Sequence, residues 1–72
     1  MHVVILTEPQ QRFMRQFLKK TKRFQEWIDV VPVWPGSDGK VARNLHNMGL
    51  VSYNDRVSLA TITDAGRRYL GR

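Results

Sequence analysis

Four polar side chains in the middle of the chain have types suited to contact with nucleic-acid bases. They are Lys40, Arg43, Asn44 and Asn47, and their spacings of three, one and three residues place them on one stripe of an α-helix. Arginine can form two hydrogen bonds with guanine in the major groove, and asparagine can do the same with adenine. The stripe predicts a DNA-contacting surface. The alternative is an ordinary solvated helix face.

A helix over residues 38–48 is predicted to carry this stripe. Val41, Leu45 and Met48 recur at helical spacing and indicate the face turned to the core. Gly49 is typical of the position just after a helix. A helix of this length spans about 16 Å, which is enough to cross a major groove about 12 Å wide.

A two-stranded hairpin is predicted over residues 50–62, with Asn54 in its turn. Arg56 stands at the predicted tip, from which its side chain can reach a minor groove or phosphates. The alternative is a turn that simply needs a soluble residue. Thr63 is the predicted N-cap of a last short helix over residues 64–70.

Two helices are predicted before the stripe, over about residues 8–20 and 22–29. The core face of the first consists of Phe13, Met14, Phe17 and Leu18. The core face of the second consists of Phe24, Trp27, Ile28 and Val31. From residue 30 to residue 36, two prolines and a glycine exclude a helix and predict an extended segment that then turns. Trp34 lies between those prolines, and it either covers the core or is exposed as an anchor for a protein partner.

The densest group of positive charges precedes the stripe and contains no acidic residue. Its members are Arg12, Arg15, Lys19, Lys20, Lys22 and Arg23. We expect phosphate contacts from some of them, or else a solvated basic face, because a winding helix cannot turn all of them the same way.

The bulk composition favours a polyanionic partner. The chain has 72 residues, with 12 Lys and Arg against six Asp and Glu, for a formal charge of +6. A chain of this length allows one small domain, over residues 1–72. The apolar run Val3 to Leu6 is too short for a signal-peptide core or a membrane span, so we expect a soluble cytoplasmic protein with no membrane partner.

Catalysis, a cofactor and a metal are not expected. The chain has no cysteine, which excludes a disulfide, a thiolate zinc site and a Cys nucleophile. His2 and His46 fall in unrelated predicted elements, so they do not predict a metal site. The serines have no evident base partner, and there is no glycine-rich phosphate loop. We therefore predict a binding protein and not an enzyme.

Three segments carry a resemblance to a known family. Residues 41–51 resemble the recognition helix and first wing strand of winged helix-turn-helix regulators. Residues 60–70, with their apolar-Thr-acid-Ala-Gly pattern, look like the second wing strand and following helix of the MarR-type branch, and residues 7–13 are similar to the start of its first core helix. The resemblance implies an α+β fold: a single winged helix-turn-helix domain with three core helices, a two-stranded wing and a short C-terminal helix. Residues 30–36 depart from the family, which joins its second and third helices by a shorter turn.

The family resemblance and the charge together predict sequence-dependent binding of double-stranded DNA. The expected protein is a small transcriptional regulator, and its stand-alone size suggests a phage or mobile-element origin. Homodimer formation or weak affinity is expected, because a single copy makes few contacts. The apolar arm formed by residues 1–6 is a candidate intermolecular strand. The alternative is a winged-helix protein-interaction module, such as a small phage inhibitor that docks on an acidic host protein or nucleoprotein complex.

Overall fold

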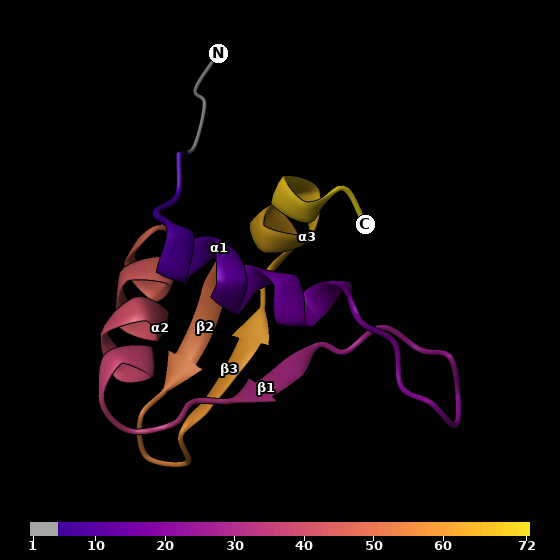
Figure 1. The fold of residues 1–72 in the computed structure, drawn as a ribbon, viewed down its shortest axis with the longest axis horizontal. Coiled ribbons are helices and arrows are strands. Elements are labelled where there is room, and N and C mark those ends of the chain that lie inside the picture. The colour runs from indigo at the N-terminus through magenta and orange to yellow at the C-terminus, as the bar shows by residue number, and fades with distance from the viewer. Residues whose placement is uncertain (1–4) are drawn as a thin grey trace.

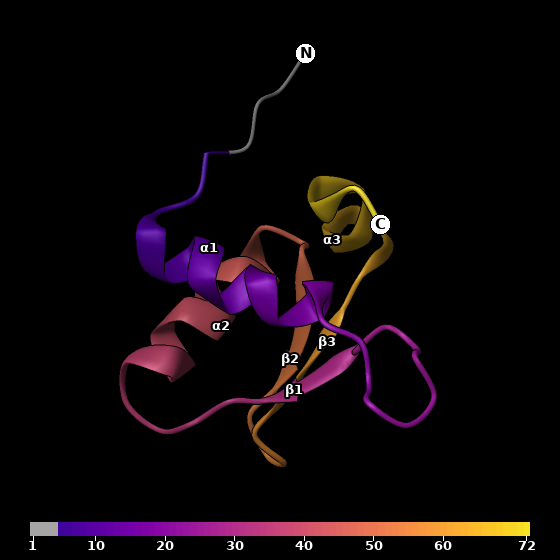
Figure 2. The same ribbon diagram turned by 45° about the vertical axis from the view of Figure 1, so that its right-hand side comes forward.

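A three-stranded antiparallel sheet forms the centre of the fold, and helices cover one of its faces (Figures 1 and 2). The computed structural model describes residues 5–72, so residues 1–4 of the predicted N-terminal arm lie outside it. The elements are α1 (Glu8–Arg15), the 3-10 turn η1 (Gln16–Leu18), β1 (Val30–Pro32), α2 (Ser37–Asn47), β2 (Val51–Asn54), β3 (Leu59–Ile62) and α3 (Asp64–Leu70). The predicted α+β class is confirmed.

The sheet has the order β1-β3-β2 and separates an inner apolar face from an outer solvent face. Successive residues of a strand point to opposite faces. Val31, Ala60 and Val51 are buried on the inner face, where α1 and α2 pack. Val30 pairs with Thr61 in register, and both are exposed on the outer face. The core therefore lies between one side of the sheet and the two helices.

Helix α1 begins and packs as its sequence predicts. The backbone N–H of Thr7 donates to Oε1 of Gln10 at 3.0 Å, which is half of a capping box, and Pro9 lies in the first turn. Phe13, with its neighbours Met14 and Phe17, is buried. The helix ends at Arg15 and not at residue 20, and a 3-10 turn follows it. Leu18, which was predicted on the core face, is exposed, so that prediction was wrong.

The helix predicted over residues 22–29 does not form, and this prediction was wrong. Thr21 starts a turn, in which its hydroxyl accepts from the backbone N–H groups of Phe24 and Glu26. Gln25 then takes a positive φ of 53°, which reverses the chain instead of continuing a helix. Phe24 and Trp27 are exposed as a result, so their predicted place in the core was also wrong.

Residues 28–33 lead into the sheet instead. Ile28 is half-buried. Val31 is buried as predicted, but it belongs to a strand and not to a helix. Two helices therefore precede the hairpin β2–β3 and not the predicted three core helices, and no helix stands directly before α2 within residues 19–36. The extended segment predicted from residue 30 is confirmed as β1.

The structure contains the helix predicted over residues 38–48, the hairpin predicted over residues 50–62 and the last helix predicted over residues 64–70, in that order. Helix α2 begins and ends one residue earlier than predicted, with Leu45 fully buried and Val41 half-buried. Ala42, which was not among the predicted core residues, is also fully buried. Met48, the residue that caps the C-terminal end of α2, is exposed, so its predicted core position was wrong.

Helix α3 is fixed to the α2–β2 junction by Thr63 and Gly66. The Thr63 hydroxyl accepts from the backbone N–H of Gly66 at 3.1 Å and donates to the carbonyl of Gly49. A Cβ atom at Gly66 would collide with the carbonyl oxygen of Leu50 and would lie 2.8 Å from Cγ1 of Ile62. The Thr-acid-Ala-Gly pattern thus has a local structural cause: a helix cap followed by a close helix-to-backbone approach.

Candidate nucleic-acid interface

The predicted contact stripe is exposed along the outer side of α2. Its members are Lys40, Arg43, Asn44 and Asn47, and all four are exposed. Successive helical residues are about 100° apart around the axis, so the two fully buried residues of α2, Ala42 and Leu45, lie opposite the stripe. The structure therefore turns the four side chains to solvent, as the apolar periodicity of the helix predicts.

A shallow hollow between α2 and β2 brings part of the stripe next to the hairpin. Arg43 and Asn47 line it from the helix, together with His46, and Tyr53 and Asp55 line it from the hairpin. The backbone N–H of Tyr53 donates to Nδ1 of His46 at 3.2 Å. A neutral imidazole that accepts at Nδ1 carries its proton at Nε2, so His46 fastens the edge strand to the helix and retains a donor.

Arg56 is exposed in the turn between β2 and β3, as predicted. Its backbone N–H donates to Oδ1 of Asn54 at 3.0 Å, which fixes the turn in the way expected of asparagine. Ser58 completes the reversal with a φ of 54°. Arg56 therefore lies exposed in a hydrogen-bonded turn, although it does not line the hollow.

Asp55 is the residue of this surface that the sequence reasoning missed. It lines the same hollow as Arg43 and Asn47 and contributes a negative charge there. The sequence offers only its position beside Arg56, because the hairpin register decides which side of the turn faces α2. Its carboxylate can accept from the amino group of cytosine in a major groove, and it repels phosphate.

The cations of the stripe and the tip are not neutralised within the described chain. Among residues 5–72, the ion pairs join Arg12 to Glu8, Arg67 to Asp64 and Arg72 to Asp29. Lys40, Arg43 and Arg56 take part in none of these pairs. Their charges are therefore available to an anionic partner.

Most of the larger basic group lies apart from the stripe. Its six members are exposed on α1 and on the segment after it: Arg12, Arg15, Lys19, Lys20, Lys22 and Arg23. In Figures 1 and 2 the segment after α1 extends to the right, whereas α2 lies on the left. The structure therefore does not gather the four cations of that segment and the stripe into one surface, whereas Arg12 of α1 lines a hollow with the start of α2.

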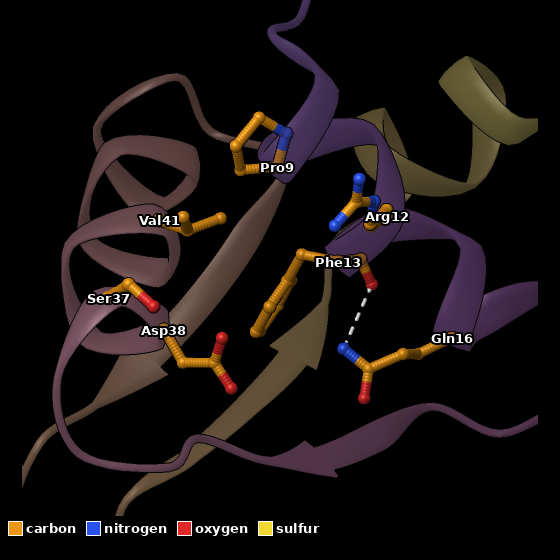
Figure 3. Close-up of a pocket in the computed structure, with 7 residues that line it drawn as sticks. All are labelled: Pro9, Arg12, Phe13, Gln16, Ser37, Asp38 and Val41. Carbon is orange, nitrogen blue, oxygen red and sulfur yellow. Dashed lines mark hydrogen bonds between the residues drawn. The ribbon is translucent and has the colours of Figure 1, made fainter.

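A second concave surface lies between α1 and the start of α2 (Figure 3). Phe13 forms its apolar wall, and Gln16 donates from Nε2 to the carbonyl of Phe13 at 3.2 Å. The carboxylate of Asp38 points into this space, while Arg12 on the other side is paired with Glu8 at 2.7 Å. The hollow thus combines an apolar wall with the carboxylate of Asp38, which takes part in none of the ion pairs among residues 5–72.

Other ligand classes receive no support from the described residues. Residues 5–72 contain no group of three or more His, Cys, Asp or Glu side chains that is arranged to hold a metal ion. None of the helices formed by those residues has the length and apolar character needed to cross a membrane. Trp34, for which two placements were open, is 68% exposed and does not cover the core.

Comparisons of the chain with protein-family models, with curated proteins and with solved structures found no match.

Proposed function

We propose that the protein binds double-stranded DNA through α2 and the β2–β3 hairpin, as a small transcriptional regulator of winged-helix type. The observation that carries this proposal is the exposed stripe on α2, whose cations are unneutralised within residues 5–72 and which borders the hairpin at a shared hollow. The stripe carries the residue types that bind guanine and adenine edges.

Each residue has a distinct role in this proposal. Arg43 and Asn47, which face the hollow, contact base edges in the major groove, and Asn44 lies beside them on the stripe. Lys40, which lies nearer the start of α2, contacts the phosphate backbone of the DNA. Arg56 contacts phosphates or the minor groove from the hairpin tip. A single copy makes few such contacts, which favours binding as a homodimer.

The fold of this proposal is a winged helix that lacks one helix. The hairpin β2–β3 is the wing, α2 is the recognition helix, and β1 is the third strand. The connection from β1 to α2 spans only residues 33–36. No helix lies between β1 and α2 to cross the DNA backbone, so α2 and the wing supply the contacts.

The experiment is a salt titration of duplex binding by fluorescence anisotropy, with random-sequence and selected duplexes of about 20 base pairs. Duplex affinity should fall linearly on a log–log plot as salt rises, because bound phosphates release counterions. Arg43→Ala should weaken selected duplexes by about 1–3 kcal/mol and random duplexes much less. Arg68→Ala is the matched control, since Arg68 is an exposed arginine on α3.

Two results would contradict the proposal. One is the absence of duplex binding at about 50 mM salt, where electrostatic contacts are strong. The other is an equal loss for Arg43→Ala and Arg68→Ala, since the contact would then not lie on α2. An equal loss on selected and random duplexes would instead make Arg43 a phosphate contact.

A second candidate function, docking on a protein, is favoured by the outer face of the sheet. Trp34 is 68% exposed and follows Val33, whose backbone N–H donates to the carbonyl of Ser58 at 2.8 Å and so extends the β1–β3 pairing. Val57 and Leu59 are exposed on the adjoining turn and strand. Under this alternative, Trp34→Ala abolishes capture of a protein from nuclease-treated lysate and leaves DNA binding intact. Loss of DNA binding with retained capture would exclude it.

A further inference from the structure

The segment that replaces the predicted second helix is a short hairpin, here called the finger (residues 19–29). Lys20 and Trp27 form an antiparallel bridge, and the backbone N–H of Ile28 donates to the carbonyl of Lys19 at 3.0 Å. At the far end, the N–H of Thr21 donates to the carbonyl of Glu26 at 2.8 Å. The finger thus has its own hydrogen-bonded frame, and it extends away from the sheet in both views (Figures 1 and 2).

One of the two aromatic rings of the finger anchors it to the domain. The Nζ of Lys20 lies 4.7 Å from the ring centroid of Trp27, and the guanidinium carbon of Arg72 lies 5.1 Å from it. Arg72 is itself held by the carbonyls of Phe17 and Ile28, at 2.9 and 3.1 Å. Trp27 therefore serves an internal cation–π contact.

The other ring is presented to solvent. Phe24 lies in the turn of the finger and is 67% exposed, which is unusual for a phenylalanine. The guanidinium of Arg23 lies 5.5 Å from the centroid of its ring. An exposed ring with a cation beside it offers a flat apolar surface and a positive charge at the same point.

The charge around Phe24 is strongly positive. Lys19, Lys20, Lys22 and Arg23 oppose only Glu26 between residues 19 and 26, so the net charge of that stretch is four minus one, or +3. All five of these side chains belong to exposed residues, and none of them takes part in an ion pair among residues 5–72. The nearby Asp29 is already paired with Arg72.

We propose that the finger is a binding site for single-stranded DNA, in which a base stacks on Phe24 while Lys22 and Arg23 contact the flanking phosphates. Base-to-aromatic stacking beside a positive groove is how proteins bind single strands without reading sequence. An unpaired base exposes its face, whereas the bases of an intact duplex cover one another. This function goes beyond the proposed duplex interface, which lies at the other end of the molecule.

The test is binding of a fluorescein-labelled 12-nucleotide oligothymidylate, followed by anisotropy, with a 2-aminopurine version that reports stacking. Phe24→Ala should weaken binding about 5- to 150-fold, the range expected for the loss of one stacked base. The slope of affinity against salt should not change. Lys22→Gln should reduce the steepness of that slope by about 0.7, the value for one phosphate of a single strand.

Matched variants separate stacking from general effects. Trp34→Ala removes an aromatic side chain of nearly equal exposure, 68% against 67%, outside the finger, and it should bind the oligonucleotide as the parent does. Phe24→Trp should retain binding and the change in 2-aminopurine fluorescence. Arg43→Ala should leave single-strand binding unchanged, so a failure of the duplex proposal and a failure of this one are distinguishable.

Three outcomes overturn the proposal. The first is binding of Phe24→Ala within about twofold of the parent, because stacking on that ring contributes more than this. The second is a preference of about tenfold or more for RNA of the same sequence, since the exposed ring and cations address groups that DNA and RNA share. The third is binding to vesicles containing phosphatidylserine with no binding to the oligonucleotide, which would make the finger a membrane contact.

Discussion

Replacing Arg72 should destabilise the whole domain, although the sequence shows it only as one of several C-terminal cations. Its side chain is 5% exposed. Its guanidinium donates to the main-chain carbonyls of Phe17 and Ile28 and to the carboxylate of Asp29. It also lies over Trp27. Arg72→Ala removes all of these contacts in one step.

The expected size follows from the partners of the guanidinium. A hydrogen bond to a charged group contributes about 1.5–3 kcal/mol net. The two carbonyl contacts are part-buried, whereas the Asp29 side chain is 47% exposed, so its ion pair is screened by solvent and adds little. We therefore expect a loss of about 3 kcal/mol from Arg72→Ala. A domain of this length has a total stability of about 4–11 kcal/mol, so the loss is a large fraction of it.

Urea unfolding followed by Trp fluorescence and by circular dichroism measures this loss. For a small domain the slope m is about 1 kcal/mol per M, so the midpoint should fall by about 3 M. Arg72→Lys should recover only part of the stability, because an ammonium cannot reproduce the planar fork that holds several acceptors at once. Arg68→Ala, an exposed control on α3, should change stability by no more than about 0.5 kcal/mol.

An Arg72→Ala variant whose stability lies within about 0.5 kcal/mol of the parent's would contradict this role of Arg72, because ordinary surface substitutions fall in that range. The role would also be contradicted if Arg72→Lys were as stable as the parent, since charge alone would then account for the contact. A fall in the slope m without a change in midpoint would indicate a change in the unfolded state instead.

Two further substitutions test the packing of α3 and the electrostatics of the hollow. Gly66→Ala should lower the free energy of unfolding in urea by about 1–3 kcal/mol, because a Cβ there meets the Leu50 carbonyl and the Ile62 side chain. The gain of about 1 kcal/mol in helix propensity does not offset this overpacking. A stability equal to that of the parent would show that α3 can move away. Asp55→Asn should strengthen duplex binding up to about fivefold at about 50 mM salt, because it removes a partly screened negative charge beside Arg43. Weaker binding of selected duplexes alone would indicate that the carboxylate contacts a cytosine.

The elements predicted well from the sequence are those that depend on local signals. The last helix has the predicted bounds, because the Thr63 hydroxyl caps it and Gly71 ends it in a left-handed conformation. The β2–β3 hairpin follows from the Asn54 turn, and α2 follows from an apolar spacing that stops at Gly49. Each of these signals acts within about four residues of the structure that it specifies.

The finger shows why helical periodicity failed between residues 22 and 29. The spacing of Phe24, Trp27 and Val31 fits a helix, but Val31 is buried through its pairing with Ala60 of β3. That pairing joins residues far apart in the sequence, so a local pattern does not reveal it. The hydroxyl of Thr21 accepts from the backbone N–H groups of Phe24 and Glu26. Threonine hydroxyls offer the backbone this alternative to helical hydrogen bonds at helix starts and in turns.

The candidate site was predictable in its helical half and at the hairpin tip, where Arg56 is exposed as predicted. Periodicity alone indicates that Arg43 and Asn47 turn to solvent. The hairpin register brings Asp55 to the same hollow, and the sequence carries no clear sign of this register. Arg72 was equally hidden, because its acceptors at Phe17 and Ile28 lie 55 and 44 residues away.

Because no helix lies between β1 and α2, few cations of one copy face the duplex. The salt dependence of duplex binding therefore measures the number of copies bound. If Arg43 contacts a base, Lys40 and Arg56 remain for phosphates, and two phosphates predict a slope of about −1.8 for one copy. Two copies on one site predict about −3.6. A slope steeper than this requires further cations, and Arg12 of α1 lines a hollow together with the start of α2. Arg12→Gln should then flatten the slope by about 0.9 for each copy bound, whereas it should have no effect if α2 and the β2–β3 hairpin supply every contact.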